Sequence, residues 1–278
     1  MYPKTSKLIA EIGQNHNGSL TEAKHLVDMA AISGCYGCKS AKREITLFPD
    51  SWRNTIYNTP TSFGKTYYDH RIALELTKPE YTELCQYTKS KGLLFGSSFT
   101  DIPSLDFVSE IGVDYLKIAS SRVVDIPLLK AVAAKKLPVI LSCGMSTLEE
   151  ISRAIHILKT APYLAVLQCT ACYESPISEL HLNALELLKK LQLPFGLSSH
   201  SRWIHSALVA RGFGAEWFEF HITSSRMNKG TDHAFALELK HLLEVSELLR
   251  DSDESLGKCE RTLYECELAA AKKLRSDL

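Results

Sequence analysis

The chain has 278 residues, and its 32 basic and 32 acidic side chains cancel to a formal net charge of zero. This length is near the roughly 250 residues of a single barrel of eight strand–helix units, so one large domain is expected. The balanced charge creates no global field for nucleic acid or an anionic membrane, and we expect neither as a partner. No apolar run reaches the length of a transmembrane helix, and the run near the N-terminus is too short for a secretory signal, which favours a cytoplasmic protein.

Short apolar runs alternate along the chain with amphipathic stretches of helical period. This alternation is typical of repeated strand–helix units around a parallel sheet. We therefore predict an α/β fold, in which residues 1–254 form a (β/α)8 TIM barrel and residues 255–278 form a tail with an extra C-terminal helix. The eight predicted strands, each followed by a helix, are 7–12, 37–41, 93–99, 115–119, 138–143, 164–170, 195–198 and 217–223.

Three predicted helix starts carry the S/T-x-x-E pattern, in which a hydroxyl and a carboxylate cap the first turn. The pairs are Ser19 with Glu22, Thr77 with Glu80, and Ser146 with Glu149.

Two segments depart from the regular pattern. Residues 42–78, rich in Asn, Thr, Pro, Gly and Tyr, separate the second strand from its helix. Connections of this length are usually lids or binding loops. In the tail, apolar residues recur at helical spacing and predict one amphipathic helix outside the barrel. These residues are Leu263, Cys266, Ala270 and Leu274.

The eight cysteines include two C-x-x-C pairs, Cys35 with Cys38 and Cys169 with Cys172. Such pairs occur in zinc and redox sites. The strand assignment puts one pair at the start of the second strand and the other at the end of the sixth, at opposite ends of the barrel. We therefore expect free thiols, since disulfides are rare in cytosolic proteins.

Charged residues recur inside the apolar strand sequences, as Glu11, Lys117 and Glu219 illustrate. Successive strand residues point to opposite faces, so each charge shares a face with the residue two positions away. A buried charge is costly unless it meets a partner or a ligand. A structural ion network explains one such residue well, but several of them favour a binding site.

Lysines and hydroxyls at successive strand ends predict an anion site. Lys39 and Lys117 suit phosphate or carboxylate, and Ser97, Ser120 and Ser142 add hydroxyl donors. A single serine at a strand end is ordinary loop chemistry. Their joint occurrence indicates a phosphate cradle.

Two histidines lie near the carboxyl ends of the seventh and eighth predicted strands. His200 and His221 could coordinate a divalent metal and leave positions open for substrate and water, as catalytic sites require. For either one alone, the alternative is a hydrogen-bonded core histidine. His16 is expected to hold loop backbone, and Glu11 beside a metal-bound electrophile could act as a base.

Ordered motifs between Leu8 and Leu278 carry a family resemblance. They are IAEIGQNHNGS, YLKIASS, PVILSCGMSTLEEI, LQCTACYESP, GLSSHS, EFHIT and KGTDHAFALE. In this order and spacing, the chain resembles the N-acetylneuraminate (sialic acid) synthases and their legionaminic and pseudaminic acid relatives. The segment SFGKTYYDHRIALELT, preceded by Lys42 and Arg43, is more similar to the nonulosonate branch than to the classical sialic acid enzymes.

The resemblance implies a TIM barrel that condenses phosphoenolpyruvate with the open-chain aldehyde of an N-acetylated amino sugar and releases phosphate by C–O cleavage. It also implies a homodimer and a divalent metal cofactor, usually Mn2+, with Mg2+ or Co2+ as alternatives.

The resemblance also assigns residues by motif. His200 and His221 would be metal ligands, and the catalytic residues would be Glu11, His221 and Asp232. Phosphoenolpyruvate would be held by Lys39, Ser97, Lys117, Ser120, Ser142 and Thr170. The sugar would meet Glu11, Tyr173 and Asp232, with Lys65, Tyr67 and Arg71 of the long loop as further candidates.

The chain departs from the family pattern at Ala41, where relatives commonly carry Gln, at Ser199, where they carry Asp, and at Arg122, where an acidic residue is common. Relatives usually continue into a small antifreeze-like domain that caps the partner subunit's site, whereas this chain stops at Leu278. A separate capping polypeptide is therefore a candidate partner. Two alternatives follow: the same chemistry on a sugar phosphate, as in ulosonate-phosphate synthases, and a non-catalytic barrel that binds phosphoenolpyruvate and sugar without turnover.

Overall fold

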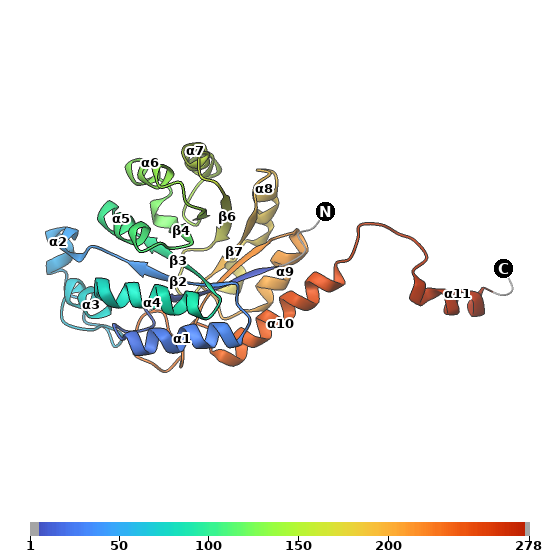
Figure 1. The fold of residues 1–278 in the computed structure, drawn as a ribbon, viewed down its shortest axis with the longest axis horizontal. Helices are drawn as coiled ribbons and strands as arrows, with labels where there is room; N and C mark the ends of the chain where they lie inside the picture. Colours follow the sequence, from blue (N-terminus) through green and yellow to red (C-terminus); the bar gives the residue numbers. More distant parts are fainter. Residues whose placement is uncertain (1–5, 276–278) are drawn as a thin grey trace.

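Eight parallel strands close into a barrel in the computed structural model, which describes residues 6–275 (Figure 1). Strands adjacent in sequence are adjacent in the barrel, and β8 pairs with β1 to complete it. The strands are β1 (Lys7–Gly13), β2 (Gly37–Lys42), β3 (Leu94–Phe99), β4 (Tyr115–Ile118), β5 (Val139–Ser142), β6 (Leu164–Cys169), β7 (Phe195–Ser199) and β8 (Trp217–His221). The predicted TIM barrel and all eight strands are confirmed. Residues 1–5 of the predicted barrel segment (1–254) and residues 276–278 of the predicted tail (255–278) lie outside the described part.

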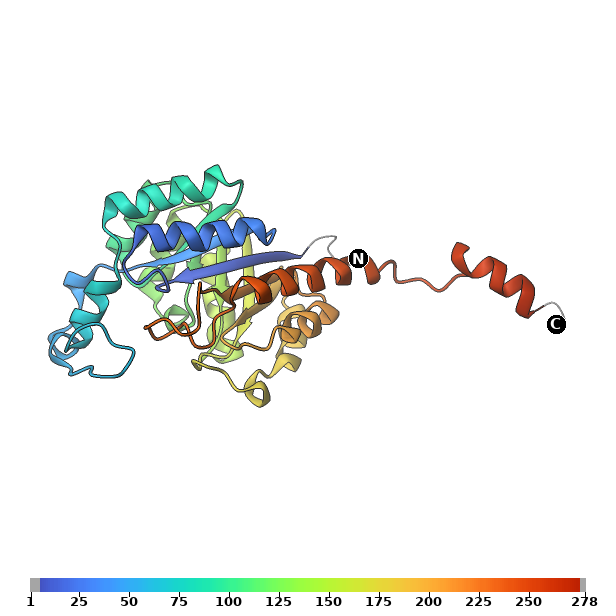
Figure 2. The ribbon, with the colours of Figure 1, turned by 90° about the horizontal axis from the view of Figure 1, so that it is seen from below.

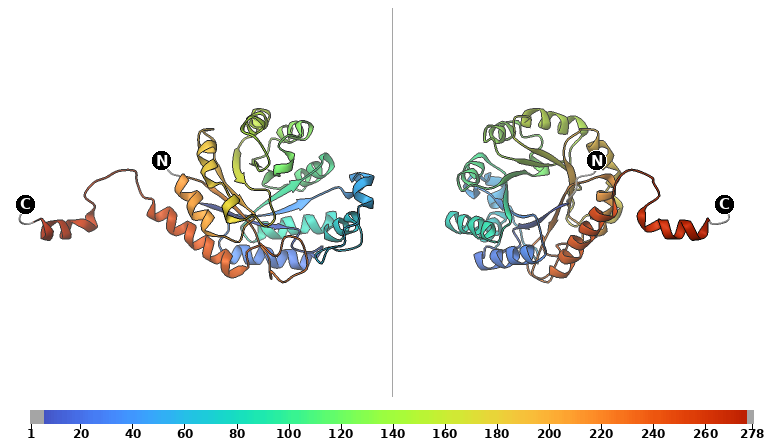
Figure 3. Two further views of the ribbon diagram at one scale, coloured as in Figure 1. Left: turned by 180° about the vertical axis from the view of Figure 1, so that it is seen from behind. Right: turned by 45° about the vertical axis from the view of Figure 1, so that its right-hand side comes forward.

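Helices cover the outside of the barrel and follow each strand, as predicted (Figure 3). They are α1 (Leu20–Ile32), α4 (Lys78–Ser90), α5 (Ile102–Glu110), α6 (Ile126–Ala134), α7 (Leu148–Leu158), α8 (Leu185–Lys189), α9 (His205–Phe213) and α10 (Leu239–Ser255). Helices neighbouring in the ring contact each other, for example α6 with α7 and α9 with α10. Between residues 6 and 275, no helix is both long and apolar enough to cross a lipid bilayer.

A small apolar layer fills the barrel interior toward the amino ends of the strands. It consists of Ile9, Tyr115, Ile140, Ala165, Leu167 and Trp217. Two residues further along the same strands, and therefore on the same face, stand Glu11, Lys117 and Ser142. The apolar layer closes the interior beneath these polar side chains, so they face the carboxyl ends of the strands.

Close approach of β7 and β8 depends on Gly196. A Cβ at this position would lie 1.9 Å from the carbonyl oxygen of Trp217, which cannot retreat without disturbing the ladder. We expect Gly196→Ala to lower the free energy of unfolding by about 3 kcal/mol. Gly212 in α9 has open space around its Cβ position, so Gly212→Ala should raise the free energy of unfolding by about 0.5–1 kcal/mol. Urea unfolding followed by circular dichroism measures both, and equal midpoints for the two variants would contradict this account.

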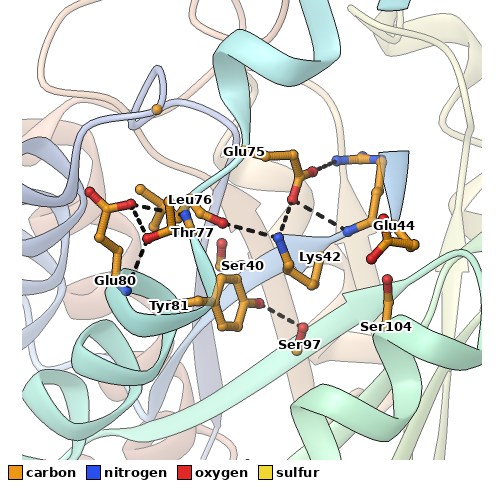
Figure 4. A network of polar contacts seen from close by, with 12 residues as sticks. Ser40, Lys42, Glu44, Glu75, Leu76, Thr77, Glu80, Tyr81, Ser97 and Ser104 are labelled. Atoms are coloured by element: carbon orange, nitrogen blue, oxygen red, sulfur yellow. Dashed lines mark hydrogen bonds and ion pairs between the residues drawn. The ribbon is translucent and has the colours of Figure 1, made fainter. Parts of the chain in front are cut away.

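One of the three predicted helix caps is confirmed in full, because Thr77 with Glu80 forms a complete capping box (Figure 4). A second is confirmed in part: the Ser19 hydroxyl accepts a hydrogen bond from the Glu22 amide, but the Glu22 carboxylate accepts from the Ser224 hydroxyl and does not cap the helix. The third prediction is wrong by one residue, because α7 starts at Leu148 and its capping box joins Thr147 with Glu150. The Ser146 hydroxyl instead donates to the carbonyl of Gly144.

The connection between β2 and α4 has regular structure of its own, which corrects the prediction of a long loop. It contains a 3-10 turn η1 (Ile45–Leu47) and two helices, α2 (Asp50–Asn54) and α3 (Tyr67–Leu74). Figure 2 shows it projecting from one end of the barrel. We call residues 43–77 the excursion.

Glu75 ties the two ends of the excursion together, as Figure 4 shows. Its Oε2 accepts a hydrogen bond from Lys42 Nζ at 2.8 Å, and its Oε1 lies 3.5 Å from Arg43 Nη1. Lys42 Nζ also donates to the carbonyl of Leu76 at 3.0 Å. The end of β2 is thereby held against the start of α4.

The C-terminal tail lies away from the barrel in every view (Figures 1–3). Beyond α10 the chain forms a short 3-10 turn η5 (Glu265–Glu267) and helix α11 (Leu268–Leu274). The predicted extra helix is confirmed for Ala270 and Leu274, whereas Cys266 lies in the 3-10 turn and Leu263 precedes it. The helix is shorter than predicted.

All eight cysteines are free thiols, as predicted. Cys35 and Cys38 are buried near the start of β2, and Cys169 is buried at the end of β6 while Cys172 is exposed. Burial raises the pKa of the Cys38 thiol well above its usual range. The two C-x-x-C pairs therefore form neither disulfides nor a common site.

Candidate active site

One polar cavity of about 330 Å3 opens at the carboxyl ends of the strands. The predicted site residues that line it are Glu11, Lys39, Lys117, Ser120, Ser142, Tyr173, His200, His221 and Asp232. Those that do not line it are Ser97, Thr170, Lys65, Tyr67 and Arg71. Every strand except β3 contributes a predicted residue, from the strand itself or from the loop that follows it. The cavity therefore lies on the axis of the barrel.

Two buried lysine–carboxylate pairs stand side by side on the cavity floor. Lys39 of β2 forms an ion pair with Glu11 of β1. Lys117 Nζ lies 3.6 Å from Glu219 of β8, and it donates to the Ser142 hydroxyl at 2.6 Å. Because each ammonium meets a carboxylate or a hydroxyl, the cost of burying these charges is offset.

The electrostatics of the floor follow from this pairing. Burial lowers the pKa of Lys39 to about 8, although the nearby Glu219 charge opposes the shift. Burial would raise the pKa of Glu219, but the charges of Lys117 and Lys39 and a hydrogen bond from Ser198 lower it to about 2. Near neutral pH Glu219 is therefore ionised, and a proton can leave Lys39 more easily than an ordinary lysine.

Serine hydroxyls line the side of the cavity beyond Lys117. Ser120, after β4, accepts a hydrogen bond from the Gly144 amide at 3.0 Å, and both Ser120 and Ser142 face the cavity. This arrangement matches the predicted cradle except at β3. There the structure corrects the assignment, because the Ser97 hydroxyl lies 2.7 Å from the Tyr81 hydroxyl of α4, outside the barrel (Figure 4). The β3 residue that lines the cavity is Ser98.

His200 and His221 meet across the opposite side, with ring centroids 5.2 Å apart. His200 Nδ1 lies 2.9 Å from the Thr170 carbonyl oxygen, which can only accept, so Nδ1 carries the proton and Nε2 keeps its lone pair. Thr170 thus contributes its backbone, while its hydroxyl donates to the carbonyl of Glu179. The predicted role of the Thr170 side chain is not supported by this placement.

His221 has a buried nitrogen without a hydrogen-bond partner in the described chain. This Nδ1 lies 3.7 Å from Asp232 Oδ2, too far for a hydrogen bond. Burial lowers the pKa of His221 to about 3, and the His200 and Lys39 charges act in the same direction. A neutral imidazole with a free lone pair is the state that a metal ion requires.

His200 differs electrostatically from His221. Burial would lower its pKa, but the Cys169 thiol at 3.8 Å and the Thr170 carbonyl raise it above its ordinary value. Within residues 6–275, no three or more His, Cys, Asp or Glu side chains are arranged to hold an ion by themselves. The two histidines fit an open site in which other ligands complete the coordination.

Tyr173 covers the two histidines from the loop after β6. Its ring stacks on His200 at a centroid distance of 4.1 Å and meets His221 edge-on at 6.4 Å. The ring also packs against Phe235, while 60% of the residue stays exposed. Tyr173 therefore lies at the mouth of the cavity, where a bound molecule would meet it.

The three candidates from the excursion do not reach the cavity. Lys65 is exposed, and Tyr67 accepts a hydrogen bond from Arg71 Nε at 2.8 Å. Arg71 Nη1 in turn donates to Gln14 Oε1, and Gln14 does line the cavity. Arg71 therefore lies one residue behind the cavity wall.

Sequence reasoning missed several lining residues. Gln14, Arg43, Ser98 and Ser198 all face the cavity, and so does Glu219, which the sequence singled out as a charged strand residue without assigning it a role. Strand alternation carried the signal for Ser198 and Glu219, since they lie two positions from the predicted ligands His200 and His221. Gln14 and Arg43 follow their strands, where alternation no longer predicts direction.

The three departures from the family pattern have different placements. Ala41 lines the cavity, where its short side chain leaves space. Ser199 is buried, and its hydroxyl accepts from the Ser201 amide at 3.3 Å. Arg122 Nη1 lies 3.4 Å from Asp125. Of the three, Ala41 alone lines the cavity.

Several proteins with similar sequences are synthases of sialic and related acids. Human N-acetylneuraminate-9-phosphate synthase is 33% identical over 271 residues, which cover 96% of this chain and 76% of the human protein. N,N'-diacetyllegionaminic acid synthase of Legionella pneumophila is 33% identical over 285 residues, covering 99% of this chain and 80% of the relative.

A solved structure agrees with the sequence matches. The N-acetylneuraminic acid (sialic acid) synthetase from Leptospira borgpetersenii, in complex with citrate, superposes with a TM-score of 0.84 at 30% identity and covers 99% of this chain and 92% of its own. The NeuB family itself matches residues 26–261, which include most of the barrel and every residue of the cavity from β2 onward. The chain belongs to the NeuB family.

Proposed function

We propose that the protein condenses phosphoenolpyruvate with the open-chain aldehyde of an N-acetylated amino sugar, giving a nonulosonic acid and phosphate. One observation supports the proposal. An anion-binding region built on Lys117 and Ser142 faces two imidazoles, His200 and His221, each with a nitrogen lone pair available, across a single cavity. The first half suits a phosphorylated carboxylic acid, and the second suits a metal that activates a carbonyl.

Phosphoenolpyruvate would bind on the side of the cavity formed by β2 to β5. Lys39 and Lys117 would neutralise its carboxylate and phosphate, while the Ser120 and Ser142 hydroxyls would donate hydrogen bonds. The Gly144 amide, which donates to Ser120, would orient that hydroxyl. The C3 methylene would then face the side of the cavity that carries the two histidines. When both reactants are bound in one cavity of this size, the bimolecular reaction between them becomes effectively unimolecular.

His200 Nε2 and a lone pair of His221 would hold a divalent cation, Mn2+ in our proposal, with substrate and water in the remaining positions. When bound there, the cation would supply Lewis acidity to the aldehyde oxygen of the acceptor.

The acceptor sugar would lie between Glu11, Asp232 and Tyr173. Carbon C3 of phosphoenolpyruvate forms the new bond to the aldehyde carbon, water adds at C2, and the C2–O bond breaks to release phosphate and leave a 2-keto acid. Glu11, held by Lys39, would accept the proton of the incoming water or a hydrogen bond from a sugar hydroxyl, and the aldehyde oxygen would take up a proton as it becomes a hydroxyl. The atoms balance without an oxidant or reductant.

A second candidate is the same reaction on a sugar phosphate. Arg43 lines the cavity, and its ion-pair partner Glu75 does not, so the Arg43 guanidinium adds a positive charge at the mouth. An acceptor phosphate would suit this position. The human relative is named as a 9-phosphate synthase, which is consistent with this candidate.

A phosphate-release assay tests the proposal. The protein is mixed with phosphoenolpyruvate, MnCl2 and one acceptor at a time, namely N-acetylmannosamine, its 6-phosphate and a diacetamido-hexose. We expect phosphate only when an acceptor is present, complete loss of release on addition of EDTA, and recovery with excess Mn2+. The acceptor with the highest kcat/KM separates the two candidates.

If a folded preparation binds phosphoenolpyruvate in calorimetry and releases no phosphate with any acceptor, the proposal fails. That outcome would favour the non-catalytic barrel. Release without an acceptor would also count against condensation, because it would indicate simple hydrolysis.

A further inference from the structure

A continuous chain of polar contacts joins the excursion to the metal side of the cavity. Arg71 Nη1 donates to Gln14 Oε1, and Gln14 Nε2 donates to the Thr231 hydroxyl at 2.7 Å. The Thr231 hydroxyl donates to Asp232 Oδ1 at 2.8 Å, which leaves Oδ2 turned toward His221. The chain links the excursion, the loop after β1 and the loop after β8.

Arg71 sets the donor and acceptor direction of every hydrogen bond in this series of polar contacts. A guanidinium can only donate, so the oxygen of the Gln14 amide must face it and the nitrogen must face Thr231. The Thr231 hydroxyl has a single proton, and because it accepts from Gln14, that proton is free to go to Asp232. Without Arg71, the Gln14 amide can rotate and present its oxygen to Thr231, which would draw the proton away from Asp232.

Aromatic packing fixes the position of Arg71. Its Nε donates to the Tyr67 hydroxyl, and its guanidinium lies 4.9 Å from the Tyr67 ring centroid. The Tyr67 ring is in turn stacked on Phe48 and met edge-on by Trp52 and Tyr57. Tyr67 therefore holds Arg71 in one orientation rather than contacting a ligand.

We propose that Arg71 is a positioning residue, which acts through Gln14 and Thr231 to orient the Asp232 carboxylate toward the acceptor sugar. The proposal rests on the proposed function for the identity of that sugar, but the polar chain itself does not. It replaces the direct sugar contact expected for Tyr67 and Arg71 from the sequence. Through Arg71, the excursion then contributes to the acceptor half of the site.

A double-mutant cycle on steady-state kinetics tests this role. Arg71→Met and Thr231→Val are each expected to raise the KM for the acceptor about 10-fold, as for the loss of one hydrogen bond to a charged group, with no change in the KM for phosphoenolpyruvate. Because both act on Asp232 through one chain, the double variant should also show an increase of about 10-fold, not about 100-fold.

Two matched variants control the cycle. Thr231→Ser keeps the hydroxyl and should restore the KM of the acceptor to within about twofold of the wild-type value. Tyr57→Phe removes a hydroxyl from the same aromatic cluster, outside the polar chain, and should leave both KM values unchanged. A multiplicative double variant, or equal increases in both KM values, would overturn the positioning role.

A spectroscopic test does not depend on turnover. The protein contains only four glutamines, so the side-chain NH2 signals of 15N-glutamine-labelled protein can be resolved. The signal that disappears in Gln14→Asn is that of Gln14. We expect this signal to shift in both Arg71→Met and Thr231→Val, and to stay in place in Tyr57→Phe. If neither variant moves it, the inference is wrong even if the enzyme condenses its substrates. If the signal moves but the wild type releases no phosphate, the proposed function fails and the polar chain stands.

Discussion

Replacing His221 by alanine is expected to lower the rate of phosphate release by at least about 1000-fold. His221 is buried, its low pKa keeps it neutral, and its Nδ1 has no hydrogen-bond partner among the described residues. If His221 holds the proposed metal, its loss removes Lewis-acid stabilisation of several kcal/mol, and each 1.4 kcal/mol corresponds to tenfold in rate. Stopped assays of phosphate release at saturating Mn2+, phosphoenolpyruvate and acceptor measure the loss.

The matched control is His156→Ala, on the exposed side of α7, which should keep the wild-type rate. Calorimetry with Mn2+ alone should show weaker binding to His221→Ala than to the control. A variant that retains more than about a tenth of the wild-type rate would remove His221 from the metal site and return it to the alternative of a core histidine.

The second large effect is expected at Lys117, whose ammonium lies between Ser142 and Glu219 in the barrel interior. Lys117→Met leaves the Glu219 charge without its nearest cation, and breaking a buried pair in this way costs about 3–5 kcal/mol of unfolding free energy. The same substitution removes a cation from the anion cradle, so phosphoenolpyruvate binding should fall at least about 10-fold. Urea unfolding and calorimetry separate the two effects.

Adding Glu219→Gln distinguishes the two roles of Lys117. The double variant no longer buries an unpaired carboxylate, so it should regain at least half of the lost stability, while phosphoenolpyruvate binding should stay weak. The pH dependence gives a further check. Since the folded-state pKa of Glu219 is about 2, below its ordinary 4.5, its ionisation stabilises the wild-type fold above about pH 4.5, and this contribution is lost as the pH falls toward 2. In Lys117→Met this acid-sensitive contribution should shrink.

The barrel was predictable because the pattern of a short apolar strand followed by an amphipathic helix repeats eight times. An error at the end of one strand therefore does not change the topology. The histidines were predictable for a similar reason, because His200 and His221 end or follow adjacent strands. Ser97 was assigned to the wrong face although its strand was identified. Phe95 and Phe99 pack in the outer core, and Ser97 lies between them on the same face, so alternation places it against α4 and leaves Ser98 inside.

Other features depend on information that local patterns do not contain. Ser146 and Thr147 each have Glu three residues later, so the S/T-x-x-E pattern fits both, and only the true start of α7 decides between them. Arginine is a residue type that often binds anionic ligands, which made Arg71 a candidate. One of its partners, Tyr67, lies on the same helix α3, but the other, Gln14, lies in the loop after β1. Its place behind the cavity wall results from tertiary packing between the excursion and the loop after β1.

The Glu75 clamp on Lys42 and Arg43 has an evolutionary consequence. Because the clamp fixes where the excursion leaves β2 and where it rejoins the barrel before α4, the residues between can change in length and sequence without displacing either element. Under the proposed function, selection can therefore act on the acceptor side of the cavity through a segment outside the barrel, while the lysines and serines on the strands stay fixed. A clamped insertion of this kind would allow one scaffold to diversify its choice of sugar while it keeps its chemistry.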